Sequence, residues 1–138
     1  MKLLIINGPN LNLLGQRDTQ MYGTQRFEDY FSELKSRTKS ELTYFQSNVE
    51  GELINEIQRA EVDGIIINAG GYTHTSVAIR DCIDAVNTPV VEVHISNIAA
   101  RDSFRHESMI SPVCAGCIFG FGLRGYDLAI HFFEGNIS

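Results

Sequence analysis

The hydrophobic positions of this chain follow two patterns that alternate along its length. Continuous apolar runs, of which residues 64–67 form the clearest, are typical of strands that are covered on both faces. Between such runs, apolar residues recur at helical spacing, as Phe27, Tyr30, Phe31 and Leu34 do. The sequence therefore predicts strands that alternate with amphipathic helices.

These patterns place the elements along the chain. The strands are expected at residues 2–7, 42–46, 64–67, 89–93 and 113–119. The helices are expected at residues 26–38, 50–61, 76–86 and 126–134. Such alternation implies parallel pairing through right-handed crossovers. We therefore predict a single domain over residues 1–138, with an open five-stranded parallel α/β sheet and helices on both faces.

Composition narrows the class of protein. Apolar residues make up 43% of the chain and the net charge is −6, so the sequence has no basic footprint for nucleic acid. No apolar run approaches the ~18 residues of a membrane span. The N-terminal run MKLLIINGPN is too short for the core of a signal peptide and fits a first strand better. We therefore expect a cytoplasmic protein that binds neither nucleic acid nor membranes.

The three cysteines raise a separate alternative. Cys114 and Cys117 have the C-x-x-C spacing of a redox or zinc motif. Positions three apart in a strand point to opposite faces, however, and a structural zinc site usually needs four ligands. The sequence has no second cluster of this kind. We therefore expect these cysteines and Cys82 to be small, buried core residues.

Polar residues gather after three of the predicted strands. The segments are NGPNLNLLGQRDTQMYG at 7–23, NAGGYTHTS at 68–76, and HISN at 94–97 with two arginines beyond it. In open α/β sheets, ligands bind beyond the carboxyl ends of the strands. The sequence therefore predicts a ligand site where these three segments converge.

Several chemistries lack their motif here. The chain has no G-x-G-x-x-G or Walker A loop for a nucleotide and no G-x-S-x-G elbow for a hydrolase. A zinc ion could take His74 and His94, but no suitable third ligand stands nearby. No lysine occurs in the three segments, which argues against a Schiff base. We therefore expect neither a cofactor nor a metal.

The remaining side chains can bind a hydroxylated carboxylate and move protons. They are Asn10, Arg17, Tyr22, Asn68, His74, His94, Ser96, Arg101 and Arg105. Arginine binds carboxylates with two hydrogen bonds. A free Tyr titrates near ~10, and lowering its pKa to ~7 needs about 4 kcal/mol of differential stabilisation. A desolvated pocket with one or two arginines could supply it, so a Tyr and a His are the candidate proton-transfer groups.

Three long motifs carry a family resemblance. INGPNLNLLGQRDTQMYG, NAGGYTHTSVAIRD and VEVHISNIAARDSFRHESMISPVCAG occur in this order, and together the likeness runs from residue 2 to about 130. In these motifs the chain resembles the type II 3-dehydroquinate dehydratases. The resemblance implies a flavodoxin-like fold and the anti elimination of water from 3-dehydroquinate to 3-dehydroshikimate. That reaction belongs to the shikimate pathway and proceeds through an enolate without a Schiff base.

The resemblance also implies roles for individual residues. Tyr22 matches the general base and His94 the general acid, while Arg17 lowers the pKa of the Tyr and Asn10 stabilises the enolate through a water. Glu92 is expected to orient His94 or a nearby group. The implied substrate-binding residues are Asn68, His74, Asp81, Ile95, Ser96 and Arg105, of which Asp81 reaches a neighbouring subunit's site. Arg101 falls on a lid together with Arg17 and Tyr22.

The resemblance further implies a homododecamer built from trimers. Two positions depart from the family's pattern: Thr19 stands where Pro is frequent, and Ala99 stands where His is frequent. Neither departure removes a proposed chemical group. The main alternative is a non-catalytic binder of a sugar acid or flavin on the same fold. The sequence leaves open whether the enzyme serves biosynthesis or quinate breakdown.

Overall fold

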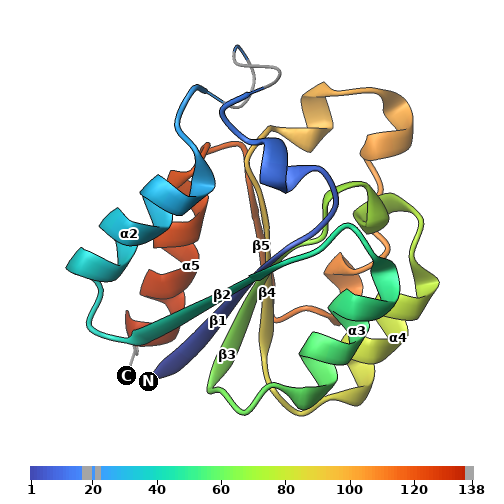
Figure 1. The fold of residues 1–138 in the computed structure, drawn as a ribbon. Helices are drawn as coiled ribbons and strands as arrows, with labels where there is room; N and C mark the ends of the chain where they lie inside the picture. Colours follow the sequence, from blue (N-terminus) through green and yellow to red (C-terminus); the bar gives the residue numbers. More distant parts are fainter. Residues whose placement is uncertain (17–19, 21–22, 136–138) are drawn as a thin grey trace.

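A parallel sheet forms the centre of the computed structural model, which describes residues 1–16, 20 and 23–135 (Figure 1). Its strands lie in the order β2-β1-β3-β4-β5, and every neighbouring pair is parallel. The strands are β1 (Lys2–Asn7), β2 (Glu41–Gln46), β3 (Gly64–Asn68), β4 (Val90–His94) and β5 (Gly116–Phe119). This is the flavodoxin-like order, as the sequence predicts.

Helices cover both faces of the sheet (Figure 1). They are α2 (Phe27–Arg37), α3 (Glu50–Arg59), α4 (Val77–Ala85) and α5 (Arg124–Gly135). Helices α2 and α5 pack on one face, and α3 and α4 pack on the other. All four predicted helices are confirmed, with ends that lie within two residues of the expected ones. None of these described helices is long and apolar enough to cross a membrane.

Alternation along each strand divides the core into two layers. In β1, Leu3 and Ile5 join the cluster under α2 and α5, whereas Leu4 and Ile6 join the cluster under α3 and α4. All four side chains are at most 5% exposed. Burying one such side chain contributes roughly 1.5–3 kcal/mol, so both helix layers are held firmly against the sheet. A residue's place in a strand therefore tells which helix layer it faces.

The fifth strand begins later than predicted. Residues 111–113 form a short 3₁₀ helix, and the strand starts only at Gly116. Pro112 stands in that turn, where its fixed φ suits the helical geometry and its missing N–H costs nothing. The predicted strand began directly after Pro112, and its apolar residues did not show that the turn takes up residues 113–115 before the strand begins.

The expected burial of all three cysteines is wrong in part. Cys82 is buried in α4, but Cys114 is only partly buried and Cys117 is exposed. Cys114 precedes β5, and Cys117 lies on a strand at the edge of the sheet. Desolvation of the sulfur atoms and the nearby charge of Glu92 raise the pKa of Cys114 to about 12 and that of Cys117 to about 11, so both thiols stay protonated at neutral pH.

A buried hydroxyl in α2 leads to a stability prediction. The Tyr30 side chain is 5% exposed, and its hydroxyl has no hydrogen-bond partner among the described residues. Because a buried polar group without a partner destabilises the folded state, we expect Tyr30→Phe to raise the free energy of unfolding by about 1 kcal/mol. Urea unfolding measures this change. A loss of stability in this variant would show that the hydroxyl is bonded in solution.

Candidate active site

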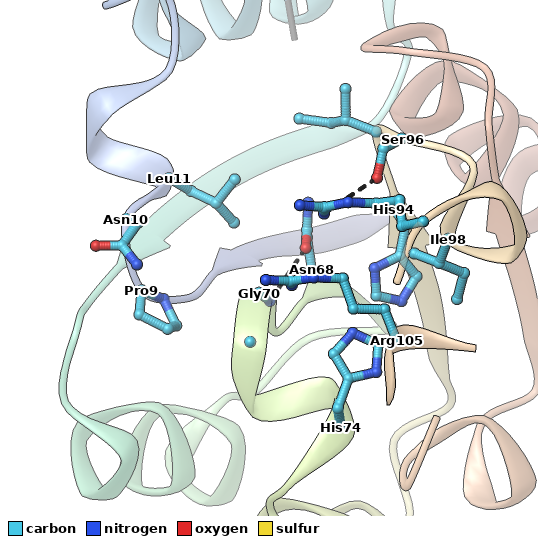
Figure 2. A pocket seen from close by; sticks show the side chains of 13 residues that line it. Pro9, Asn10, Leu11, Asn68, Gly70, His74, His94, Ser96, Ile98 and Arg105 are labelled. Atoms are coloured by element: carbon cyan, nitrogen blue, oxygen red, sulfur yellow. Dashed lines mark hydrogen bonds between the residues drawn. The ribbon is translucent and has the colours of Figure 1, made fainter. Parts of the chain in front are cut away.

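A cavity of about 170 Å³ opens beyond the carboxyl ends of β1, β3 and β4 (Figure 2). Its walls come from the three polar segments that follow these strands. It is lined by Pro9, Asn10, Leu11, Asn68, Gly70, Gly71, His74, His94, Ile95, Ser96, Ile98, Arg101 and Arg105. The cavity lies at the edge where parallel α/β sheets bind their ligands.

Two glycines let the loops after β1 and β3 approach each other. A Cβ on Gly8 would lie 2.5 Å from the Ala69 carbonyl oxygen, a distance that side chains do not tolerate. Gly70 has a φ of +59°, which favours glycine, and a Cβ there would meet the Pro9 carbonyl oxygen at 3.0 Å. This close approach brings Asn10 to the cavity wall.

The most deeply buried charge near the cavity belongs to Glu92. The Glu92 side chain is 0% exposed, and its Oε2 accepts a hydrogen bond from His94 Nε2 at 2.5 Å. Ser108 donates to the same oxygen at 2.8 Å, and Ser111 donates to the other. Burial alone would raise the pKa of Glu92, but the hydrogen bonds from His94, Ser111 and Ser108 outweigh it and lower the pKa. Glu92 is therefore ionised at neutral pH.

The hydrogen bonds of His94 and His74 show which nitrogen of each imidazole ring carries the proton. Because the Glu92 carboxylate only accepts, His94 carries a proton on Nε2, and Nδ1 is the nitrogen left for a ligand. His74 Nδ1 lies 2.8 Å from the Glu107 carbonyl oxygen and so also donates. The two rings stack with their centroids 6.5 Å apart. His94 and His74 thus stand side by side in the cavity wall (Figure 2).

Two arginines bring positive charge to the cavity. Arg105 extends across it between His74 and Asn68 (Figure 2). Its buried Nε has no hydrogen-bond partner among the described residues, and Asp102 Oδ2 lies 3.8 Å away. Arg101 Nη1 donates to Ser96 Oγ at 3.5 Å. An orphaned guanidinium nitrogen of this kind is suited to bind an anionic group of a ligand.

The lining residues come from both faces of the sheet. By the alternation of β4, Glu92 and His94 have the parity of Val90, which faces α3 and α4. By the alternation of β3, Asn68 has the parity of Ile66, which faces α2 and α5. The cavity therefore lies across the end of the sheet, with His94 supported from one layer and Asn68 from the other.

The structure brings together eight of the residues singled out in the sequence. These are Asn10, Asn68, His74, His94, Ile95, Ser96, Arg101 and Arg105. Asp81 is exposed on α4 and is not part of this cavity's lining, so its role at a neighbouring subunit's site stays a prediction. Arg17 and Tyr22 lie outside the described residues.

Sequence reasoning missed the two serines that hold Glu92. Ser108 precedes a short 3₁₀ helix and Ser111 begins it, and this stretch has no periodicity that could place them beside a residue in β4. The one available signal was the ionisable Glu92 inside an apolar strand, because a buried carboxylate needs donors. Those donors could have come from any loop at this edge of the sheet.

The bonds to Glu92 predict a pH-dependent stability. Since folding lowers the pKa of Glu92, its ionised form stabilises the protein above the ordinary value of 4.5, and this contribution is lost as the pH falls below it. We expect Glu92→Gln to lower the free energy of unfolding by about 2–3 kcal/mol at pH 7. The difference from the wild type should shrink below pH 4.5. Urea unfolding at pH 7 and below pH 4.5 measures this difference in the free energy of unfolding, and Glu41→Gln, at an exposed position, is the control. A difference that is independent of pH would contradict the assignment.

Strand order and cavity position define a flavodoxin-like α/β protein with a ligand site at the carboxyl edge of its sheet. The family model described as dehydroquinase class II matches residues 1–134. The chain therefore belongs to the class II dehydroquinase family, and it is an enzyme of the hydro-lyase class.

Individual relatives agree with the family match. The chain is 53% identical to a 3-dehydroquinate dehydratase of Campylobacter lari over 135 residues, which cover 94% of this chain and 84% of that protein. It is 54% identical to one from an Exiguobacterium species, over 95% of this chain and 92% of the relative. The crystal structure of type II dehydroquinase from Butyrivibrio crossotus superposes with a TM-score of 0.93 at 46% identity, covering 97% of both chains.

Proposed function

We propose that this enzyme removes water from 3-dehydroquinate to give 3-dehydroshikimate, as a step of the shikimate pathway. The observation that carries the proposal is His94, which a buried, ionised Glu92 holds in the wall of a cavity. The same cavity contains Arg105, whose Nε makes no hydrogen bond to the described residues. The relatives named above carry the name 3-dehydroquinate dehydratase. The cavity thus offers both a proton donor and a partner for the carboxylate of the substrate.

His94 acts as the general acid in this proposal. In its protonated form it gives the Nδ1 proton to the departing hydroxyl, and Glu92 balances the positive charge of the ring through Nε2. Loss of the hydroxyl moves the electron pair of the enolate into the new carbon–carbon double bond. The ring is returned to the neutral state, ready to take a proton from solvent.

Tyr22 acts as the general base, with Arg17 favouring its tyrosinate form. The base removes a proton next to the ketone, which leaves an enolate. Asn10, at the cavity wall, stabilises the enolate oxygen through a water. Base and acid come from the segments after β1 and β4 respectively, which are separated in the sheet by β3. This separation supports delivery from opposite faces of the substrate ring, as an anti elimination requires.

The remaining lining residues bind the substrate. Arg105 pairs with the carboxylate, and Asn68 and His74 bind ring hydroxyls. Ser96 and the Ile95 backbone lie directly after His94, so they contact the same side of the ring. Arg101, which bonds Ser96, approaches the substrate from the lid. The arginines offer donors to the carboxylate, and the amide, imidazole and hydroxyl side chains offer donors or acceptors to the ring hydroxyls.

We further propose that the enzyme is cytoplasmic and forms a homododecamer built from trimers. In this assembly Asp81 reaches the active site of a neighbouring subunit. Exposed aromatic side chains support an interface between copies of the chain. Phe104 is 63% exposed, Phe119 at the end of β5 is 40% exposed, and Phe121 is 64% exposed. Large aromatic side chains of this kind are enriched in the cores of protein interfaces.

The decisive experiment adds 3-dehydroquinate to the purified protein and follows the growth of absorbance from the conjugated enone. Steady growth that depends on enzyme concentration is the expected result. Binding of 3-dehydroquinate without growth of absorbance would overturn the proposal and favour a non-catalytic binder. Borohydride added with substrate provides a control on mechanism. It should cause no inactivation, because the proposed route forms no imine with a lysine.

A further inference from the structure

A row of buried polar side chains lies between the sheet and α5, beneath the cavity. Tyr126 and Asn7 are 0% exposed and Asn68 is 4% exposed. The Tyr126 hydroxyl donates to Asn7 Oδ1 at 2.7 Å and accepts from Asn68 Nδ2 at 3.2 Å. Asn7 Nδ2 in turn donates to the Tyr44 hydroxyl at 3.4 Å. The row packs against an apolar cluster, so each of its polar groups depends on its neighbour in the row.

The register of the sheet brings these residues together. Asn7 ends β1 and pairs directly with Asn68, which ends β3. Asn7 has the parity of Leu3 and Ile5, and both asparagines therefore face the α5 layer. Tyr126, in the first turn of α5, contributes the hydroxyl that joins them. The row is thus a product of strand register and not of a flexible loop.

The hydrogen bonds of this row can run in only one direction, because the donor and acceptor at each step are fixed. The Gly70 N–H can only donate, and it lies 3.2 Å from the Asn68 side chain, so the atom that faces it must be Oδ1. The Asn68 NH₂ group then faces Tyr126, whose oxygen must accept. The hydroxyl hydrogen of Tyr126 is consequently free to donate to Asn7. One backbone N–H therefore sets the orientation of every amide in the row.

We propose that Tyr126, backed by Asn7, is a positioning residue that holds the Asn68 amide in the orientation that the Gly70 N–H sets, and so fixes its place in the cavity wall. The amide has two N–H groups and two carbonyl lone pairs, and the row uses one of each. One N–H donor and one lone pair remain, at fixed positions in the cavity wall. Such a pair is complementary to a hydroxyl, which both accepts and donates. This inference rests on the proposed role of Asn68 in binding a hydroxyl of 3-dehydroquinate.

The two tyrosines keep their protons across the working pH range. Burial raises the pKa of Tyr126 far above its usual value, and the hydrogen bonds that it makes with Asn68 and Asn7 offset only part of this rise. Burial likewise raises the pKa of Tyr44 to about 12. Since neither hydroxyl ionises at neutral pH, the direction of the row does not change with pH there.

Tyr126→Phe tests the proposal with little change in shape. The Tyr126 ring packs edge-on against Phe27 with centroids 5.0 Å apart, a contact that a phenylalanine retains. We expect KM for 3-dehydroquinate to rise about tenfold, because an amide that Tyr126 no longer holds can turn away and lose one hydrogen bond to the substrate, while kcat changes less than about threefold. Tyr30→Phe removes the same atom from the same core layer and is the matched control, with KM unchanged. An unchanged KM in Tyr126→Phe, whatever its melting temperature, would overturn the inference.

A second measurement needs no substrate. In the wild-type protein, the side-chain NH₂ of Asn68 should give two resolved proton resonances that exchange slowly with water, because one N–H is bonded to a buried hydroxyl. Rapid exchange or averaging of the two resonances would overturn the inference even where Tyr126→Phe does not fold. If the wild type fails to convert 3-dehydroquinate, the proposed function fails, but this NMR result still decides whether the row holds Asn68.

Discussion

Tyr22→Phe is expected to lower kcat for the dehydration of 3-dehydroquinate by at least about a thousandfold, because it removes the proposed general base. Binding should remain largely intact, since phenylalanine keeps the aromatic ring and the residues that line the described cavity are unchanged. Enone absorbance measures turnover, and calorimetry with the inactive variant measures binding. Because Tyr22 lies outside the described residues, this prediction rests on the sequence and the family match.

Tyr72→Phe is the matched control for that experiment. Tyr72 lies near the cavity in the 3₁₀ helix Gly70–His74, and its hydroxyl bonds the Asn48 carbonyl oxygen at 2.9 Å. Its loss removes the same atom as Tyr22→Phe, and turnover should change less than about twofold. Near-normal turnover in Tyr22→Phe would contradict the assignment of the base and make His74 the next candidate.

The second large effect is expected for His94→Gln. A glutamine amide can still donate to Glu92, so the buried carboxylate keeps a partner and the protein should fold. It cannot supply a proton at neutral pH, and kcat should fall by about a hundredfold to ten-thousandfold. Enone absorbance measures this loss, and a melting curve checks that the variant is folded.

The exposed His131 in α5 provides the control for this substitution. His131→Gln makes the same chemical change far from the cavity lining and should leave kcat unaltered. If folded His94→Gln retains wild-type turnover, another group must protonate the departing hydroxyl. His74, whose ring stacks on that of His94, would then be the first candidate.

The fold is largely predictable because its strands are covered on both faces. A continuous apolar run such as residues 64–67 is too short for a helix, and between two helical patterns it indicates a buried parallel strand. The start of β5 was the exception. An apolar run carries no mark of where a turn ends, and the turn that contains Pro112 extends into the run at Val113.

The residues of the candidate site are predictable only where a polar or ionisable side chain stands at the carboxyl end of a strand. Asn68 and His94 end β3 and β4, so the rule for carboxyl ends places them at one edge. Ser111 contacts the site from a short 3₁₀ helix and Tyr126 from α5, and both contacts depend on tertiary packing. No spacing in the sequence reports such contacts, although the buried Glu92 and Asn7 both signal that a partner must exist.

The division of the cavity between two helix layers has a further consequence for how the enzyme can change over evolution. The network around Glu92 lies on the α4 side of the sheet, and the row through Tyr126 lies on the α5 side. The packed strands lie between the two networks, and among the hydrogen bonds of the described residues none links one network to the other. Substitutions that retune proton delivery can therefore accumulate without disturbing recognition of hydroxyls, and the reverse holds as well. Each of the two networks can therefore accumulate substitutions independently, although both serve the same cavity.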